Sequence, residues 1–576
     1  MALISSALTT GRNALLSYQS ALQVVGNNIA NAGNVDYARQ TADLSAVMGA
    51  GVGSGLQPGA GVTLTGLQRH VDEALENRLR AATGDVSSAA AERDALARVE
   101  VHFDDLSGAG ISEKLVSFFN ALSDVQNAPD DLAIRAVAVS SADALTSALR
   151  SARAELSELS QDLNGEVEIA VEEADRIATE IAELNAEIVA VEAGGQGQAN
   201  ALRDRRDALL RELSELFDVA VREQPDGSIN VYVGSEPLVQ HGNSRGLTTV
   251  DELDGEFIRT TVRFADTNSR INAAGGTIEG LITARDTHAI TQIAELDNLA
   301  AAIIAEVNTI HADGQGLTPF TSLLSAHTVD DTGAALNSTQ AGLRNAPVNG
   351  SFYIVVADDA TNSSLAYRID VDLDGQGEDI SLEDLAADIN DQVSGMTASI
   401  TVDQRLSLTA DAGLSFTFGH DGEQFREDSS HVLAALGINT LFEGSSAADI
   451  AVREHLQADA GLLAAATMNR VGDGNNAGRM AAVIDTNSEL LNNASVLQAY
   501  NSIANAVASA GSSANEALEA ASAIQSALRA QRESVSGVSV DEETIELLRF
   551  ERAFQGAARY VSTVDELMQE MLALVG

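Results

Sequence analysis

Residues 370–375 are the stretch in which residue type and spacing come nearest to a binding site. They read Asp-Val-Asp-Leu-Asp-Gly, the order in which the calcium-binding loop of an EF-hand begins. Such a loop ends with a glutamate at its twelfth position, where this chain has Ser381. Residues 371–373 also read as part of a β-strand. The sequence therefore favours an acidic hairpin turn and predicts no calcium site here.

The sequence lacks the residues for cysteine chemistry and the spacing for a histidine metal site. The chain has no Cys, which removes disulfides, thiolate metal sites and Cys nucleophiles. Its nine His residues form no His-x-x-x-His or His-Glu-x-x-His pair. Residues 48–66 are rich in glycine, and the local sequence 51–55 suggests a phosphate loop but lacks its third glycine and preceding strand, so we expect a flexible connection over 48–66. We expect no metal, no cofactor and no enzymatic activity.

The charge balance excludes two classes of partner. The chain carries 84 acidic against 34 basic residues, a formal charge of −50, and Lys114 is its single lysine. A surface with this excess repels nucleic acid and anionic lipid, so neither is expected as a partner. No run of about 18 apolar residues occurs, so we expect no membrane span. Gln19, Gln23 and Asn27 interrupt the N-terminal apolar residues, and we expect no cleaved signal peptide.

The last forty residues carry the most regular apolar pattern in the chain. Its apolar positions are separated alternately by three and four residues, which predicts a helix with a coiled-coil seam over about 541–575. One helix cannot bury its own apolar stripe, so a packing partner is required. The seam consists of Leu547, Phe550, Phe554, Ala557, Val561, Val564, Met568, Met571 and Val575.

The N-terminus offers a matching seam. Small residues at Ala7, Ala14 and Ala21 run beside it and allow close approach of a second helix. We predict that the two ends pack together, or with the ends of other copies; the alternative is a helix of an ordinary helical domain. The N-terminal seam consists of Ile4, Leu8, Gly11, Leu15, Tyr18, Leu22, Val25 and Ile29. The predicted assembly interface is Leu8, Leu15, Leu22, Ile29, Leu547, Phe550, Phe554, Val561, Val564, Met568 and Met571.

Between the two ends, helical and strand patterns alternate in blocks. The spacing predicts helices over about 71–106, 111–125, 130–193, 199–216, 278–311 and 382–393, with helix dominant again after Asp449. It predicts hairpins over 219–233, with the turn at Asp226-Gly227, and over 247–264. Further strands are predicted at 352–356, 366–371, 398–402, 406–409 and 414–418. The charged cluster 203–207 reads as a solvated helix face.

These patterns define the expected fold class and domains. We expect a mainly α protein with inserted β-rich or mixed domains: long coiled-coil-like terminal helices, a helical rod domain and outer globular domains. The terminal helices occupy 1–50 and 535–576, and the rod domain 51–215 and 450–534. A mixed β-containing domain occupies 216–344, with a return helix at 278–311, and a small α/β domain occupies 345–449.

Several motifs resemble those of the axial proteins of the bacterial flagellum. They occur near both ends and in the middle of the chain, and the resemblance covers nearly its whole length. The motifs are Asn27-Asn28-Ile29-Ala30-Asn31, Tyr37-Ala38-Arg39-Gln40, Phe118-Phe119-Asn120-Ala121-Leu122, Leu202-Arg203-Asp204-Arg205-Arg206-Asp207, Leu436-Gly437-Ile438-Asn439-Thr440 and Leu547-Leu548-Arg549-Phe550-Glu551-Arg552-Ala553-Phe554-Gln555.

The resemblance implies a structural role in the flagellum, among the hook-associated proteins. It implies helical self-assembly between hook and filament, with the terminal helices lining an inner tube and the β domains outside. The implied partners are further copies of the chain, the hook protein, the third hook-associated protein and a cytosolic export chaperone on the C-terminal helix. Export would use the flagellar type III apparatus and end outside the cell. The alternatives are another axial protein, such as a hook or distal-rod protein or the third hook-associated protein, and a secreted coiled-coil surface protein.

Overall fold

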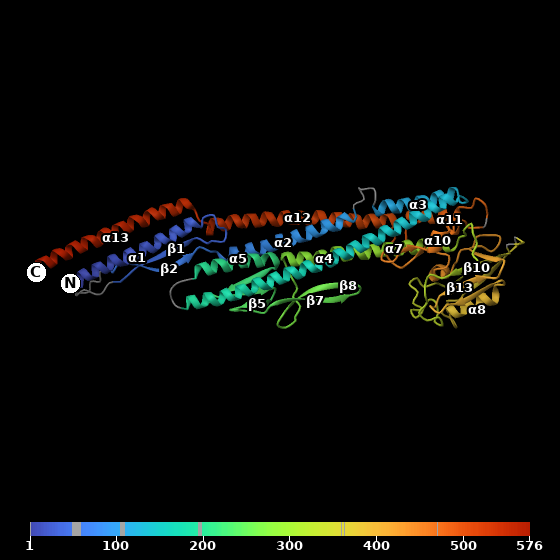
Figure 1. Ribbon diagram of the computed structural model, residues 1–576, viewed down its shortest axis with the longest axis horizontal. Helices are drawn as coiled ribbons and strands as arrows, with labels where there is room; N and C mark the ends of the chain where they lie inside the picture. Colours follow the sequence, from blue (N-terminus) through green and yellow to red (C-terminus); the bar gives the residue numbers. More distant parts are fainter. Residues whose placement is uncertain are drawn as a thin grey trace. The chain divides into compact units, whose positions relative to one another are not determined.

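The chain forms two compact units, each assembled from segments far apart in the sequence. The computed structural model describes residues 2–48, 59–103, 110–193, 199–358, 360–361, 363–468 and 470–575. The first unit comprises Met1–Ala95, Gln161–Ala284 and Ser512–Gly576, and the second comprises Leu96–Ser160 and Arg285–Gly511. Three long helices, drawn in Figure 1, begin in one unit and end in the other: α2 (Glu73–Val101), α4 (Leu132–Glu192) and α12 (Val496–Ser536).

The first unit holds both terminal helices and three antiparallel strand groups. Strands β3 to β6 form one sheet in sequence order, β7 pairs with β8, and β1 pairs with β2. Its elements are α1 (Ala2–Ala30), β1 (Gln40–Ala46), β2 (Val62–Arg69), α5 (Asn200–Leu216), β3 (Val219–Glu223), β4 (Ile229–Val233), β5 (Glu236–Gln240), β6 (Asn243–Ser244), β7 (Leu247–Asp254), β8 (Phe257–Phe264), α6 (Gly276–Thr283) and α13 (Val540–Val575).

The second unit surrounds a mixed core of two three-stranded sheets. The strand orders are β11-β10-β14 and β12-β13-β9, and Phe352, Phe416 and Phe418 are buried among them. Its longer elements are α3 (Ile111–Asn127), α7 (Ile290–Ala312), β10 (Gly350–Asp358), β11 (Ser363–Val371), α8 (Leu382–Gln392), β12 (Met396–Ile400), β13 (Leu406–Ala410) and β14 (Leu414–Phe418). Its shorter ones are β9 (Ser322–Leu324), α9 (Val432–Leu436), β15 (Phe442–Glu443), β16 (Ala451–Val452), α10 (Glu454–Ala458), η3 (Ala460–Leu462), α11 (Asn475–Ala481), η4 (Ala482–Ile484) and η5 (Glu489–Leu491).

Helix α4 shows how the sequence pattern becomes packing. Its apolar residues return every three or four positions, and Leu145, Leu149, Leu156 and Leu163 are fully buried. By length and composition α4 is also apolar enough to cross a membrane, with a mean hydropathy of 1.3 in its most apolar window. The core helix of a protein passes the same test, and 39% of that window is buried inside the structure.

The expected fold class and most of the predicted elements are confirmed. The first hairpin forms as predicted, with Val219 opposite Val233 and Gly227 at a φ of +84°, a conformation that favours glycine at this turn. The second hairpin pairs Leu247 with Phe264. The end of the stretch 48–66 that was expected to be a flexible connection is strand instead, since β2 begins at Val62. The expectation that no strand precedes this stretch is also wrong, because β1 ends at Ala46. Residues 51–55 lie outside the described residues.

Two helical predictions are wrong in part. The helix expected over 278–311 is divided by a π-helical segment, η2 (Ala284–Ala289), at the boundary between the units. Helix does not resume at Asp449, because residues 449–495 form short helices, a short strand and loops before α12 begins. Separate buried residues, such as Leu456, Leu463 and Leu491, hold this segment against the core. Buried residues spaced in this way do not produce the repeat of a helix in the sequence.

Two buried side chains connect distant segments of the second unit by hydrogen bonds to backbone groups. Arg135 donates from Nε to the carbonyl of Pro129 and from Nη1 to that of Leu463. The Nδ1–H of His311 donates to the Asn439 carbonyl at 2.8 Å, and its Nε2 accepts from the Ala464 N–H at 3.1 Å. Both ring nitrogens are used by the neutral imidazole. Burial disfavours the charged form and lowers the pKa of His311 to about 4.

This depressed pKa predicts a pH-dependent contribution of His311 to stability. The contribution is complete above the unfolded pKa of about 6.5 and is lost as the pH falls toward 4, roughly 3 kcal/mol in all. His311→Gln should cost about 1–3 kcal/mol at pH 7.5, and that difference from the native chain should shrink by roughly 2 kcal/mol at pH 5, because glutamine binds no proton. Urea unfolding at both pH values measures it, and a difference that does not change with pH would contradict the assignment.

Candidate assembly site

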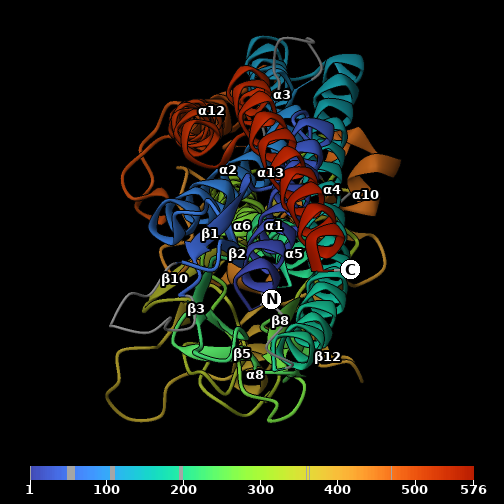
Figure 2. The ribbon, with the colours of Figure 1, turned by 90° about the vertical axis from the view of Figure 1, so that its left-hand side faces the viewer.

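The two ends of the chain pack against each other within the first unit. Helices α1 and α13 lie side by side, as Figures 1 and 2 show, and the ring centroids of Tyr18 and Phe550 are 6.5 Å apart. A side chain at Gly11 would collide with Val561 and meet Tyr560, so glycine is required for this close approach. The prediction that the ends pack together is confirmed, and the partner seam in this structure belongs to the same chain.

A buried polar cluster fixes the register of the two helices. The side-chain amide of Asn28 donates to Glu543 Oε2 and to the Gln40 carbonyl, both at 2.8 Å. Arg39 donates from Nε to Glu543 Oε1 at 2.8 Å and pairs through Nη1 with Glu542 at 3.0 Å. We call Asn28, Tyr37, Arg39 and Glu543 the terminal clamp. It joins α1, the segment before β1 and the first turn of α13.

Tyr37 completes the terminal clamp from the other side of Asn28. Its hydroxyl donates to Asn28 Oδ1 at 2.7 Å, and the same oxygen accepts from the Gln40 N–H at 3.1 Å. Burial, with the nearby carboxylates of Asp204 and Glu543, raises the pKa of Tyr37 to about 12, so the hydroxyl stays a donor. The Asn27–Asn31 and Tyr37–Gln40 motifs therefore include residues that hold both ends together.

The structure brings most of the predicted interface residues to the contact between α1 and α13. Val564 is buried, and Leu8, Leu15, Leu22, Ile29, Leu547, Phe550, Phe554, Val561 and Met568 are half-buried, while Met571 is exposed. The apolar pattern did not identify the buried Glu543, because a carboxylate is not part of a seam. The feature of the sequence that could have indicated this role is the run of three acidic residues at 541–543, together with Arg39 near the other end of the chain.

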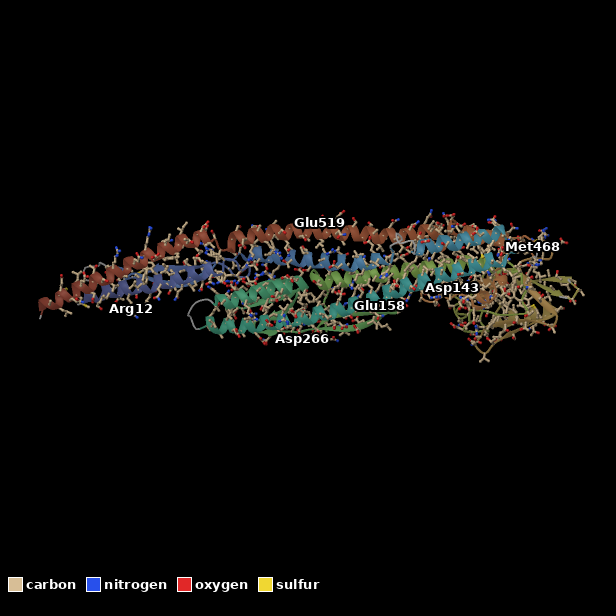
Figure 3. The ribbon with its side chains drawn as sticks, turned by 45° about the horizontal axis from the view of Figure 1, so that its top comes forward. Arg12, Asp143, Glu158, Asp266, Met468 and Glu519 are labelled. Atoms are coloured by element: carbon tan, nitrogen blue, oxygen red, sulfur yellow. The ribbon has the colours of Figure 1, made fainter. Side chains whose placement is uncertain are left out.

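Apolar side chains remain exposed on α13 after the two helices have packed. They are Ile545, Leu548, Leu567, Met571 and Leu572, together with Tyr560. At 100° per residue, Ile545, Tyr560, Leu567 and Met571 fall within about 80° of the helix surface. The outer side of α1 is different: Arg12, labelled in Figure 3, is the one charged residue of that helix, and the other exposed residues are mainly Ser, Thr, Gln and Asn.

The charged cluster 203–207 is not the solvated helix face that the sequence indicated. Arg203 and Arg206 are buried in the first unit. Arg203 pairs with Glu192 at 2.8 Å and with Glu223 at 2.6 Å, and Arg69 pairs with Asp207 at 2.5 Å. The alternating charges did not predict this burial, because a buried ion-pair network and an exposed one have the same sequence pattern.

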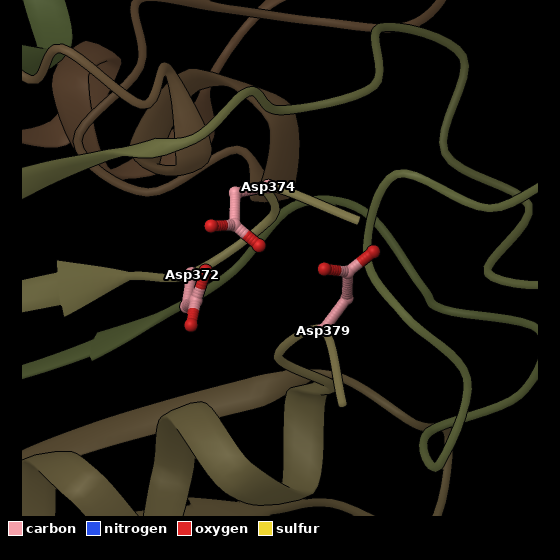
Figure 4. A group of neighbouring side chains, drawn as sticks. All are labelled: Asp372, Asp374 and Asp379. Carbon is pink, nitrogen blue, oxygen red and sulfur yellow. The ribbon is translucent and has the colours of Figure 1, made fainter. Parts of the chain in front are cut away.

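The acidic segment 370–375 begins at the end of β11 and continues into the loop between β11 and α8, which corrects the expected hairpin turn. Figure 4 shows Asp372, Asp374 and Asp379 facing one another, with one carboxylate oxygen of each within 4.8 Å of the others. Ser381 caps α8 by accepting from the Asp384 N–H at 3.1 Å. That role explains why a serine stands where a calcium loop would have glutamate.

Residues 242–246 read Gly-Asn-Ser-Arg-Gly and match the pattern of a nucleophile elbow. The structure does not support that role. Ser244 ends the two-residue strand β6, and its hydroxyl accepts from the Gly246 N–H at 3.2 Å. A nucleophile elbow requires a strand-to-helix turn, whereas this segment leads directly into β7.

Comparison with known proteins finds similarity to proteins of the bacterial flagellum. The family "Flagellar hook-associated protein FlgK helical domain" matches residues 96–321, and "Flagellar basal body rod FlgEFG protein C-terminal" matches residues 529–574. Flagellar hook-associated protein 1 of Salmonella typhimurium is 25% identical over 99% of this chain and 100% of its own length. The protein of the same name from Escherichia coli K12 is 24% identical over the same shares of both chains.

A solved structure has a similar fold. The flagellar hook junction protein FlgK from Burkholderia pseudomallei aligns with a TM-score of 0.50 and 18% identity, covering 80% of this chain and 100% of that one. Together these findings confirm the resemblance seen in the motifs: the chain is a structural component of the bacterial flagellum. Its similarity to flagellar hook-associated protein 1 extends over 99% of the chain and supports a component at the hook–filament junction.

The terminal clamp predicts unequal effects of two adjacent glutamates. Glu543→Ala removes the buried acceptor of both Asn28 and Arg39, and should weaken the contact between α1 and α13 by about 1–3 kcal/mol. Glu542→Ala is the matched control, since Glu542 is largely exposed and its pair with Arg39 should contribute less than about 1 kcal/mol. Amide hydrogen exchange in α1 should accelerate strongly only in Glu543→Ala. Equal acceleration in both variants would contradict the role of the clamp.

The loop with Asp372, Asp374 and Asp379 should not bind calcium at physiological concentrations. Two of the three carboxylates are exposed, and serine replaces the closing bidentate ligand. Calorimetric titration of the full chain with calcium should detect no site tighter than about millimolar. A micromolar site that disappears in Asp372→Ala would overturn this expectation.

Proposed function

We propose that the chain builds the hook–filament junction by helical self-assembly, with the paired helices α1 and α13 as the element through which copies associate. The observation that carries the proposal is the exposed apolar surface of α13. Helices that pack together normally bury their large apolar side chains, yet Ile545, Leu567 and Met571, which share one side of α13, stay about half exposed or more after pairing. A row of exposed apolar groups along one helix is typical of a surface that another chain covers.

The proposed interface has two layers with different tasks. The seam residues, including Leu15, Phe550, Phe554 and Val561, hold α1 to α13 within a chain. The outward residues of α13 then contact neighbouring copies in the assembled junction. From Ile545 to Met571 this surface extends about 40 Å along the helix at 1.5 Å per residue, long enough to contact more than one neighbour.

The proposed partners follow from the flagellar role. The chain would contact further copies of itself, the hook protein on one side and the third hook-associated protein on the other. Before assembly, a cytosolic export chaperone would cover the apolar surface of α13, because such a surface promotes premature association. Export through the flagellar type III apparatus, without cleavage of a signal peptide, would place the chain outside the cell. We assign no catalytic step, membrane contact or nucleic-acid contact.

The domain assignment takes the same form. Segments 1–50 and 535–576 would form the inner-tube domain, and 51–215 with 450–534 the rod domain. Segments 216–344 and 345–449 would face outward. The family match at residues 529–574 lies almost wholly within the proposed inner-tube segment. This four-part division remains a prediction.

Leu567→Asp tests the outward layer without disturbing the seam. The charge would face an apolar surface of a neighbouring copy, which costs several kcal/mol at each contact. We expect cells that carry only this variant to complete hooks without growing filaments, as seen by electron microscopy. Gln569→Asp introduces the same side chain at another exposed position of α13 and should allow normal filaments. Normal filaments in Leu567→Asp cells would contradict the proposed interface.

Phe554→Asp addresses the inner layer. It places a charge in the half-buried seam, so it should weaken both the pairing of α1 with α13 and the assembly that depends on it. Hydrogen exchange on the isolated chain should then show faster exchange in both helices, alongside the loss of filaments. Loss of filaments with unchanged exchange would show that Phe554 belongs to the outward layer instead.

A further inference from the structure

A second exposed stripe runs along α1, on the side of the helix that packs neither on α13 nor on strands β1 and β2. Its positions are separated alternately by four and three residues, and at 100° per residue they fall within about 80° of the helix surface. Helices pack in coiled coils with this spacing. We call these residues the outer stripe of α1: Ser5, Thr9, Arg12, Leu16, Gln19 and Gln23, all of them exposed.

The residue types of the outer stripe suit burial against another helix. Arg12 is the only charged residue of α1, although 20% of the residues in the whole chain are charged. Leu16 is 52% exposed. The Thr9 hydroxyl donates to the Ser5 carbonyl of its own helix at 2.8 Å, so it keeps an acceptor when the stripe is covered. Because α1 carries no carboxylate, another copy of this acidic chain can approach it with little repulsion.

The outer stripe of α1 and the exposed apolar residues of α13 point in opposite directions. The two helices are antiparallel: Asn28, late in α1, meets Glu543, early in α13. Gly11, early in α1, lies against Val561, late in α13. With their common seam as the reference, helical-wheel positions place the two surfaces roughly 180° apart around the pair. A contact between two such different surfaces is heterologous, and it generates rings or open helical arrays of copies rather than a closed dimer.

The charges of the two surfaces are complementary. Beyond Arg559, α13 carries only acidic charge, and Glu570 is exposed at the border of its apolar surface, about 20° from Ile545 on the helical wheel. Arg12 is exposed within the outer stripe of α1. Two α13 surfaces brought together would instead place carboxylates against each other, which disfavours that alternative.

We propose that the outer stripe of α1 receives the exposed apolar residues of α13 from a neighbouring copy, with Arg12 of one copy bound to Glu570 of the next. This inference rests on the proposed function, in which the outward residues of α13 contact neighbouring copies. It names the surface of the neighbour on which those residues dock.

The ion pair sets the offset between neighbouring copies. Since Gly11 lies level with Val561 in one chain, the pair requires an axial displacement of about 15 Å, ten residues at 1.5 Å each. At this offset Leu567 of one copy lies between Arg12 and Leu16 of the next, where a large apolar side chain fits the spacing of the stripe.

Thiol cross-linking of assembled junctions tests the contact itself. The chain has no cysteine, so Leu16→Cys combined with Leu567→Cys places one thiol on each surface. The two thiols of one chain lie on opposite sides of the helix pair, so a short bismaleimide should join different copies and give a ladder of multimers on a denaturing gel. Leu16→Cys with Gln569→Cys should give no ladder, because Gln569 lies about 160° from Leu567 on α13. Equal ladders, or none from the first pair in assembled junctions, would overturn the proposal.

Charge exchange tests the ion pair in cells. Arg12→Glu should reduce the number of filaments on completed hooks by at least about tenfold, because it faces Glu570 with a like charge. Adding Glu570→Arg should restore the filaments. Ser6→Glu is the matched control, exposed on α1 outside the outer stripe, and should leave filaments normal. A double variant no better than Arg12→Glu alone would contradict the pair.

The outcomes separate this contact from the proposed function. If Leu567→Asp abolishes filaments while the cross-link is absent and Arg12→Glu has no effect, α13 docks on another surface and only the role of α1 is contradicted. If Leu567→Asp cells grow normal filaments, the proposed function falls as well. Hydrogen exchange of α1 and α13 in the isolated Arg12→Glu chain should match the native chain, since Arg12 lies outside the seam.

Discussion

The buried carboxylate of Glu543 joins two parts of the chain that are 515 positions apart, and the arrangement of the ends depends on it. It accepts from Asn28 on α1 and from Arg39, which directly precedes β1. One side chain of α13 therefore fixes both ends of the chain relative to β1. An ionised carboxylate is costly to bury without donors, and this one receives two. The constraint sets the register in which the apolar seams of α1 and α13 meet.

Charge is used selectively elsewhere in the first unit. In a chain with a formal charge of −50, most surface carboxylates contribute repulsion and solubility. Three arginines with little exposure, Arg69, Arg203 and Arg532, instead bind carboxylates from α5, α4, β3 and α2. These contacts connect helices and strands that the sequence separates widely.

The sequence predicted the elements that have a strong local period. The seam of α13, the hairpin turn at Asp226-Gly227 and the strands around Phe352 follow from steps of 3.6 or 2 residues. It could not predict the π-helical break at 284–289, or the non-helical segment 449–495, because packing of distant residues decides both. The burial of Arg203 and the acceptor role of Glu543 also arise only when distant segments meet.

The sequence also predicted part of the candidate assembly site. Apolar periodicity identified the residues of the seam, since burial of a stripe is a local property of a helix. It could not tell whether the partner helix belongs to the same chain or to another one. In the structure the seam is closed within one chain, and the outward residues Leu548 and Leu567 remain for neighbours.

Oxidative cross-linking in assembled junctions tests this central claim most directly. The chain has no native cysteine, so Gly11→Cys combined with Val561→Cys places a single thiol pair at the contact between α1 and α13. Oxidised junctions should yield, on a denaturing gel, a monomer-sized band of altered mobility, as expected for a bond within one chain. A ladder of covalent multimers, absent from the single variant Gly11→Cys, would show that the seam pairs different copies and would contradict the account.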